Sequence, residues 1–143
     1  MINIESYRGV NNFLFGSKQD VVVSSFGLPC DTSLNLEGEA EIHFDGFILR
    51  FDSSSKVFRE CTILPGCAVK INGFDVEWLN GFLDWLSIED DDLKEVFGFV
   101  VSLKLGLAVT GFHDDGNSQK AIHAFSSGDW DGFSADMKDF KWK

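Results

Sequence analysis

The chain lacks the features that mark a membrane-spanning or exported protein. No apolar run in its 143 residues approaches the ~18 residues that are needed to span a bilayer. The N-terminal segment MINIESYRGVNNF has no basic stretch followed by an apolar one, as a secretory signal would. Its cysteines, Cys30, Cys61 and Cys67, are odd in number, which favours small buried thiols over a disulfide framework. We therefore expect a cytoplasmic protein that does not bind membranes.

Basic residues are also scarce, with 12 Lys and Arg against 23 Asp and Glu, for a formal net charge of −11. A negative field of this size repels nucleic-acid phosphates and anionic lipids, so neither is expected as a partner. The same field attracts basic proteins and speeds their encounter. A second reading, in which the acidity only keeps the protein soluble, stays open at this point.

Motifs that carry chemistry are missing. The histidines His43, His113 and His123 form no HxxxH or HExxH pair, and the cysteines form no CxxC pair. The DDGNS segment at 114–118 lacks the distal glutamate and the alternating oxygen ligands of a calcium loop. No GxSxG elbow, GxGxxG or GxxxxGK[ST] loop occurs. The sequence therefore predicts no catalytic residue, no metal ligand and no cofactor.

What the chain does have is enough apolar material for one domain. Apolar residues make up 44% of the sequence, Phe alone occurs 15 times, and no Pro/Gly/Ser-rich linker divides the chain. We predict a single α+β domain over residues 1–143, in which an antiparallel β-sheet packs against one to three helices. The mixed acidic and aromatic tail, 128–143, is expected to be loosely ordered.

The strand signals are densest between residues 40 and 72. Apolar residues alternate on both sides of Asp45-Gly46, which predicts a β-hairpin. Further strands are expected from Phe58 to Ile63 and from Ala68 to Ile71, which would complete an antiparallel meander of about four strands. Asn72-Gly73 predicts a second tight turn. Other strands are expected at 7–15, 99–103, 107–111 and 121–125.

Three segments favour helices. A short helix is expected after Ser17 as N-cap, ending at Gly27, although the run Val21-Val22-Val23 would also suit a strand. Residues 75–87 place apolar side chains at helical spacing and predict an amphipathic helix. Asp92 is expected to cap a short third helix at 93–97. The segment from His113 to Gln119 has the composition of a loop.

Carboxylates interleaved with tryptophans suggest a protein-binding surface. Aromatic anchors inside a charged rim are typical of interfaces, whereas a charge run alone is usually a solvated loop, and both readings remain open. Trp130, between two aspartates, is expected to be partly exposed. The candidate partner-binding residues are Asp75, Glu77, Trp78, Asp84, Trp85, Glu89, Asp90, Asp91, Asp92, Glu95, Asp114, Asp115, Asp129, Trp130 and Asp131.

The segment FGSKQDVVVSSFGLP followed by EIHFDGFILRFD resembles a recurring bacterial pattern, a short helix ending in FGxP before a hairpin. With its acidity and lack of catalytic motifs, the chain resembles the small immunity proteins of bacterial polymorphic toxins, including type VI secretion effectors. The resemblance implies a cytoplasmic antitoxin that neutralises a basic cognate toxin by binding it. It assigns no functional residue. An enzyme using His43, His123 or a cysteine, or a self-associating module, are the alternatives, and the oligomeric state is left open.

Overall fold

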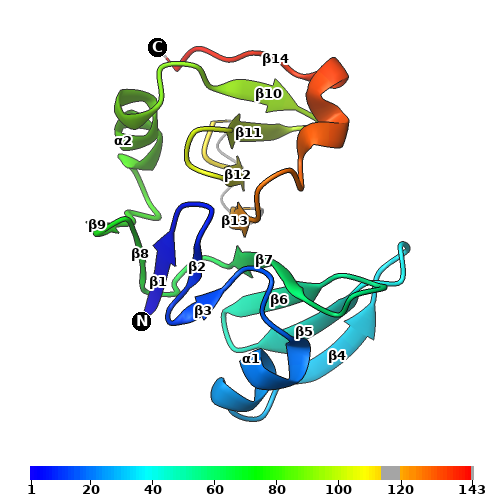
Figure 1. Ribbon diagram of the computed structural model, residues 1–143. Coiled ribbons are helices and arrows are strands. Elements are labelled where there is room, and N and C mark those ends of the chain that lie inside the picture. The colour runs from blue at the N-terminus through cyan, green and yellow to red at the C-terminus, as the bar shows by residue number, and fades with distance from the viewer. Residues whose placement is uncertain (114–119, 143) are drawn as a thin grey trace.

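The computed structural model describes residues 1–113 and 120–142, and most of these residues belong to two β-sheets (Figure 1). The smaller sheet has five strands in the order β3-β2-β1-β8-β9. Its members are β1 (Ile2–Glu5), β2 (Gly9–Val10), β3 (Phe13–Leu14), β8 (Val69–Ile71) and β9 (Phe74–Asp75).

The larger sheet has nine strands in the order β14-β10-β11-β12-β13-β7-β6-β5-β4, and every neighbouring pair in it is antiparallel. Its members are β4 (Asp31–Leu34), β5 (Ala40–Phe44), β6 (Phe47–Phe51), β7 (Phe58–Ile63), β10 (Lys94–Val96), β11 (Phe99–Ser102), β12 (Leu107–Thr110), β13 (Ala121–Phe125) and β14 (Lys138–Asp139).

Three short helices complete the described chain: α1 (Gln19–Ser25), α2 (Phe82–Glu89) and the 3₁₀-helix η2 (Asp131–Asp136). The predicted α+β class is confirmed, with sheet predominating over helix. Within the ranges that the structure describes, no helix has the length and apolarity needed to cross a membrane.

The hairpin around Asp45-Gly46 is confirmed, since β5 and β6 pair through Phe44 and Phe47. The fourth strand of the expected meander is wrong, because β8 leaves this sheet and pairs in parallel with β1. Ile2 and Ile4 are buried beside the apolar residues of β8, so the alternation of β8 is satisfied in the smaller sheet. The meander is completed instead by β4, whose four residues are all exposed and carry no apolar alternation.

The single strand expected at 7–15 is instead a hairpin of β2 and β3, which pair through Val10 and Phe13. Asn11 has a positive φ of 55° and turns the chain between them. The turn at Asn72-Gly73 is confirmed, because both residues have positive φ and join β8 to β9.

The helix after Gly16 is confirmed as a helix rather than a strand, but its N-cap is Lys18 and not Ser17. The carbonyl of Ser17 accepts the amide of Phe58, and Lys18 forms an isolated bridge to Val57. These contacts hold Ser17 and Lys18 in extended backbone, so α1 begins one residue later. Val22 is the fully buried side chain of this helix.

The helix expected at 75–87 begins later, at Phe82, and ends at Glu89. Asp75 is already paired with Lys70 in the β8–β9 hairpin. Gly81 then has a φ of 87°, a left-handed conformation that a helix interior excludes. The apolar residues between 76 and 86 are therefore divided, with those up to residue 79 before the helix and those from Phe82 onward within it.

The helix expected at 93–97 is wrong, because Lys94–Val96 forms β10 between β11 and β14. The pairing with β14 also shows that the tail, expected to be loosely ordered, contributes η2 and an edge strand. The strands expected near 99–103, 107–111 and 121–125 are confirmed as β11, β12 and β13. Of the loop expected at 113–119, residues 114–119 lie outside the described residues.

The core has two parts, one on each face of the larger sheet. The main cluster joins this sheet to the smaller sheet and both α-helices. The second cluster lies on the opposite face and includes Val101, Phe125 and Trp130. Trp130 is only 8% exposed and packs against Phe99 and Phe125, so its expected partial exposure is wrong.

Candidate protein-binding surface

The outer side of α2 carries the clearest candidate surface. Phe82, Leu83 and Leu86 of this helix are buried in the main core. Asp84 and Ile88, four residues apart on the helix, point away from the core and are exposed. The helix therefore presents a carboxylate and an aliphatic side chain side by side.

Aromatic stacking holds this helix rigidly. The Trp85 ring stacks on Phe74 of β9 with centroids 4.2 Å apart and planes 5° apart, and it also contacts Phe82. Trp78 stacks on Phe112 and donates its indole N–H to the carbonyl of Cys67 at 2.8 Å. Both tryptophans are half-buried, so they pack beneath the surface and do not project from it as exposed side chains.

The projecting apolar side chains are aliphatic and were not expected. Leu79 is 87% exposed in the turn before α2, and Ile88 is 82% exposed on the helix. We call the surface formed by these two residues, the outer edge of Trp85 and the exposed neighbouring carboxylates the α2 face. Its carboxylates are Asp75, Glu77, Asp84, Glu89 and Asp91.

The lysines near the α2 face are engaged. The Lys104 ammonium donates to the carbonyl of Glu89 at 2.7 Å. The Lys94 ammonium lies 2.6 Å from a carboxylate oxygen of Asp139 and 3.1 Å from one of Asp92. Within the described ranges, no cationic side chain lies within ion-pair distance of the carboxylates of Glu77, Glu89 or Asp91.

Asp90, a predicted surface residue, lies inside the fold. It is 3% exposed, and its carboxylate accepts the Ser102 hydroxyl at 2.7 Å and the Asp92 amide at 2.9 Å. Ser102 Oγ in turn accepts the amide of Leu105. Asp90 thus joins the end of α2 to β11. Glu95, on β10, is partly buried.

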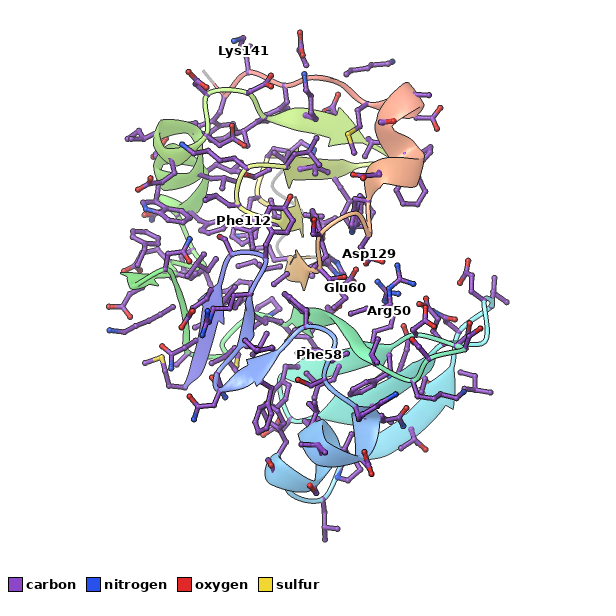
Figure 2. The ribbon with its side chains drawn as sticks, in the orientation of Figure 1. Arg50, Phe58, Glu60, Phe112, Asp129 and Lys141 are labelled. Atoms are coloured by element: carbon purple, nitrogen blue, oxygen red, sulfur yellow. The ribbon has the colours of Figure 1, made fainter. Side chains whose placement is uncertain are left out.

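Asp129, another predicted surface residue, belongs to a buried ionic network on the second face of the larger sheet (Figure 2). Its carboxylate is held by the guanidiniums of Arg50 and Arg59. The Arg50 guanidinium also donates to Glu39 at 2.6 Å and to Glu60 at 2.8 Å. Burial raises the pKa of Asp129, and the two guanidiniums oppose that rise.

The network continues from Glu60 into a histidine. His123 Nδ1 lies 3.2 Å from Glu60 Oε1 and 2.8 Å from the Thr62 hydroxyl. Burial alone would raise the pKa of Glu60, but the hydrogen bonds and charges of His123 and Arg50 outweigh it and lower the pKa to about 2. The sequence reading missed this network because its members are scattered between residues 39 and 129.

Among the described residues, the histidines and cysteines lie outside the hollow beside α2. The hollow of about 260 Å³ beside α2 is lined by residues such as Leu79, Phe112 and Lys120, and by no histidine or cysteine. All three cysteines are free thiols, and Cys61 is buried in the main core. Across residues 1–113 and 120–142, no three His, Cys, Asp or Glu side chains gather as a metal site.

The predicted surface residues thus do not share one surface. Most of those between 75 and 92 lie on or beside the α2 face, while Asp90, Asp129 and Trp130 lie within the fold. Asp131 is exposed on η2, away from α2 (Figure 1). Asp114 and Asp115 lie outside the described residues.

Comparison with known proteins finds no relative: no family model matches the chain, and neither a curated protein nor a solved structure matches it.

Proposed function

We propose that this chain is a protein-binding inhibitor that docks a basic partner on its α2 face. The supporting observation is the exposure of Leu79 and Ile88 among five exposed carboxylates. Two large aliphatic side chains left in water give no folding benefit, whereas an apolar centre inside a charged rim is the usual anatomy of an interface.

The two kinds of side chain serve different steps of association. Exposed carboxylates such as Glu77, Glu89 and Asp91 steer a cationic partner and raise the association rate. Leu79 and Ile88, once buried, slow dissociation because they lose contact with water. The stacked Trp85 and Phe74 keep the helix in place, so little order has to be gained on binding.

The resemblance to immunity proteins supports a bacterial toxin as the partner and a cytoplasmic site of action. In this proposal the chain performs no reaction. It covers an active site, or prevents a motion that the toxin needs, and its carboxylates take the place of an anionic substrate.

The test is co-expression with the products of the adjacent genes, followed by binding kinetics with any product that co-purifies. We expect a basic partner whose association rate falls at least tenfold between 50 and 300 mM salt, with a smaller change in dissociation rate. Growth of cells that express the partner should depend on this chain. A partner that binds at a salt-independent rate, or the lack of any co-purifying product, would contradict the proposal.

Two sets of variants locate the contact. The triple variant E77Q/E89Q/D91N is expected to slow association, and the double variant L79S/I88S to speed dissociation by tenfold or more. Matched controls are D20N/E37Q/D45N, which changes the net charge equally, and L36S, which removes a leucine that is even more exposed, on the β4–β5 turn. If the controls weaken binding as much as the α2-face variants, the partner does not dock there.

A further inference from the structure

The larger sheet ends in an uncovered strand. In the described chain β4 is the last strand of the sheet order, pairs with β5 alone, and has all four residues exposed. The other described strands that end a sheet, β3, β9 and β14, have two residues each. β14 also carries Lys138 and Asp139, and charged side chains commonly protect an edge from further pairing. Among the described strands, β4 therefore offers the longest edge to another strand.

The free edge of β4 presents backbone groups of two residues. Asn35 donates its amide to the carbonyl of Glu39 at 3.0 Å, so Asn35 faces β5. Because residues of an antiparallel strand alternate between its two sides, Ser33 also faces β5, whereas the amides and carbonyls of Thr32 and Leu34 face outward. Another β-strand is the group that supplies a matching row of donors and acceptors.

One face of this edge is apolar. Thr32 and Leu34 lie on the face that packs on the main core, opposite Ile42 and Ala40 of β5. Leu34 is nevertheless 71% exposed. An apolar side chain in a strand added beside β4 would cover Leu34 and extend the apolar row that Ala40 begins.

The other face of this edge is acidic. Asp31 is exposed there, and Glu41 of β5 is partly exposed beside it. Ser33 shares this face, since its hydroxyl lies 3.1 Å from Nε2 of His43. Within the described ranges, no cationic side chain lies within ion-pair distance of Asp31 or Glu41. A basic side chain on this face of an added strand would therefore meet charges that the fold leaves uncompensated.

We propose that the free edge of β4 adds an extended segment of a partner protein in which basic and apolar residues alternate. The added strand runs antiparallel to β4, as every neighbouring pair in the larger sheet does. Its apolar side chains lie beside Leu34 and its basic side chains beside Asp31, because successive residues of a strand point to opposite faces.

Charge and position separate this contact from the alternatives. A second copy of the chain fits the edge less well, because each copy carries a net charge of −11 and pairing two β4 strands would bring the same carboxylates together. β4 lies at the far end of the molecule from α2 (Figure 1). The contact therefore does not depend on the α2 face.

A pair of methylated peptides tests strand addition. The probe is a blocked seven-residue peptide in which lysine alternates with valine, added to the whole chain at low salt. We expect hydrogen exchange of the Leu34 amide to slow at least tenfold, because that amide gains an acceptor, while the Ser33 amide, which faces β5, changes less.

The position of the methyl groups distinguishes backbone pairing from charge attraction. In the antiparallel arrangement the valine opposite Leu34 turns its own N–H toward β4, and the lysine N–H groups point away. Methylating the valine nitrogens should therefore abolish the protection of the Leu34 amide, and methylating the lysine nitrogens should preserve it. Equal protection by the two methylated peptides, which have the same charge and side chains, would overturn the proposal.

The substitution L34P tests the same contact from the side of the protein. Proline at this position removes an outward amide and no hydrogen bond to β5, so Tm should stay within about 2 °C of the wild type. The affinity for the labelled lysine–valine peptide, measured by fluorescence anisotropy, should fall at least tenfold.

Charge variants supply the matched controls. D31N/E41Q should weaken peptide binding at least fivefold, whereas E89Q/D91N, which removes two charges from the α2 face, should leave it unchanged. Equal weakening by the two variants would assign binding to the overall charge and overturn the proposal. A wild-type mass that doubles with concentration, and that stays monomeric in L34P, would assign the edge to a second copy instead.

Discussion

Arg50 on β6 and Asp129, 79 residues later in the sequence, are joined by a hydrogen bond of 2.6 Å between Nη2 and Oδ2. The same guanidinium holds Glu39 and Glu60, and its own side chain is only 16% exposed. One cation therefore fastens the segment before η2 to the hairpin of β5 and β6 (Figure 2). Burial opposes the charge of Arg50, but the three carboxylates outweigh it and raise its pKa.

Replacing Arg50 with methionine should destabilise the fold strongly. The methionine keeps most of the apolar stem but removes the one cation that contacts all three carboxylates, and leaves Arg59 and His123 beside them. Removing one partner from a buried ionic group costs about 3–5 kcal/mol. Urea denaturation monitored by tryptophan fluorescence measures the change.

The matched control is Arg8→Met, which removes an arginine from an exposed pair with Glu5. Exposed pairs contribute about 0–1 kcal/mol, so this variant should denature close to the wild type. Equal stability of R50M and R8M would show that the network around Arg50 is solvated and makes no net contribution.

The stability of the fold should fall in acid because of Glu60. Its pKa is about 2 in the folded protein, below the ordinary value of 4.5 that applies once the chain unfolds. The stabilisation is therefore complete above pH 4.5 and is lost as the pH falls from 4.5 through 2. The full effect amounts to about 3 kcal/mol, of which roughly 2 kcal/mol is lost by pH 3, and urea midpoints between pH 7 and pH 3 measure that part.

E60Q removes this titration, so its stability should depend less steeply on pH below 4.5, even though it is less stable at pH 7. Glu37→Gln, on the exposed β4–β5 turn, should keep the steep dependence of the wild type. If the free energy of unfolding of E60Q fell as steeply below pH 4.5 as that of the wild type, carboxylates other than Glu60 would be responsible for the acid sensitivity.

The three thiols should react with alkylating reagents in a fixed order. Cys30 is exposed and should react first, whereas burial raises the pKa of the partly exposed Cys67 and slows its reaction. Cys61 is fully buried, which raises its pKa further, so it should react only when the chain unfolds. Mass spectrometry of timed samples gives the order. Modification of Cys61 in native buffer at the rate of Cys30 would contradict its place in the core.

The elements that sequence patterns predicted well are those with local turn chemistry. Gly46 in one two-residue turn, and Asn72 and Gly73 in the other, supply the positive φ values, so both hairpins could be read directly. The pairing of β1 with β8 joins residues about 67 positions apart in the sequence, and no local signal reports it. Helical spacing failed at 75–81 because Asp75 pairs in the β8–β9 hairpin and Gly81 has a left-handed φ, so Trp78 and Leu79 lie in a turn before α2.

The sequence located an acidic segment between residues 75 and 92, but not which of its side chains are exposed. Runs of aspartate locate an acidic region correctly, because charge is a property of the sequence. Which member of a run is buried depends on what reaches it from elsewhere. Ser102, twelve residues away, makes Asp90 internal while Asp91 remains in water.

Adjacent aspartates should therefore respond oppositely to the same substitution. D90A leaves the Ser102 hydroxyl without its acceptor and should destabilise the fold by about 1–3 kcal/mol, measured by urea denaturation. D91A should change stability by less than about 0.5 kcal/mol, since its side chain contacts solvent. Binding should reverse the order, because D91A removes a steering charge from the α2 face and slows association with the cationic partner.

The variant S102A tests whether the hydrogen bond to Ser102 is the cause. The double variant D90A/S102A should lose less free energy of unfolding than the sum of the losses of the two single variants. Additive losses would show that Asp90 and Ser102 stabilise the fold independently.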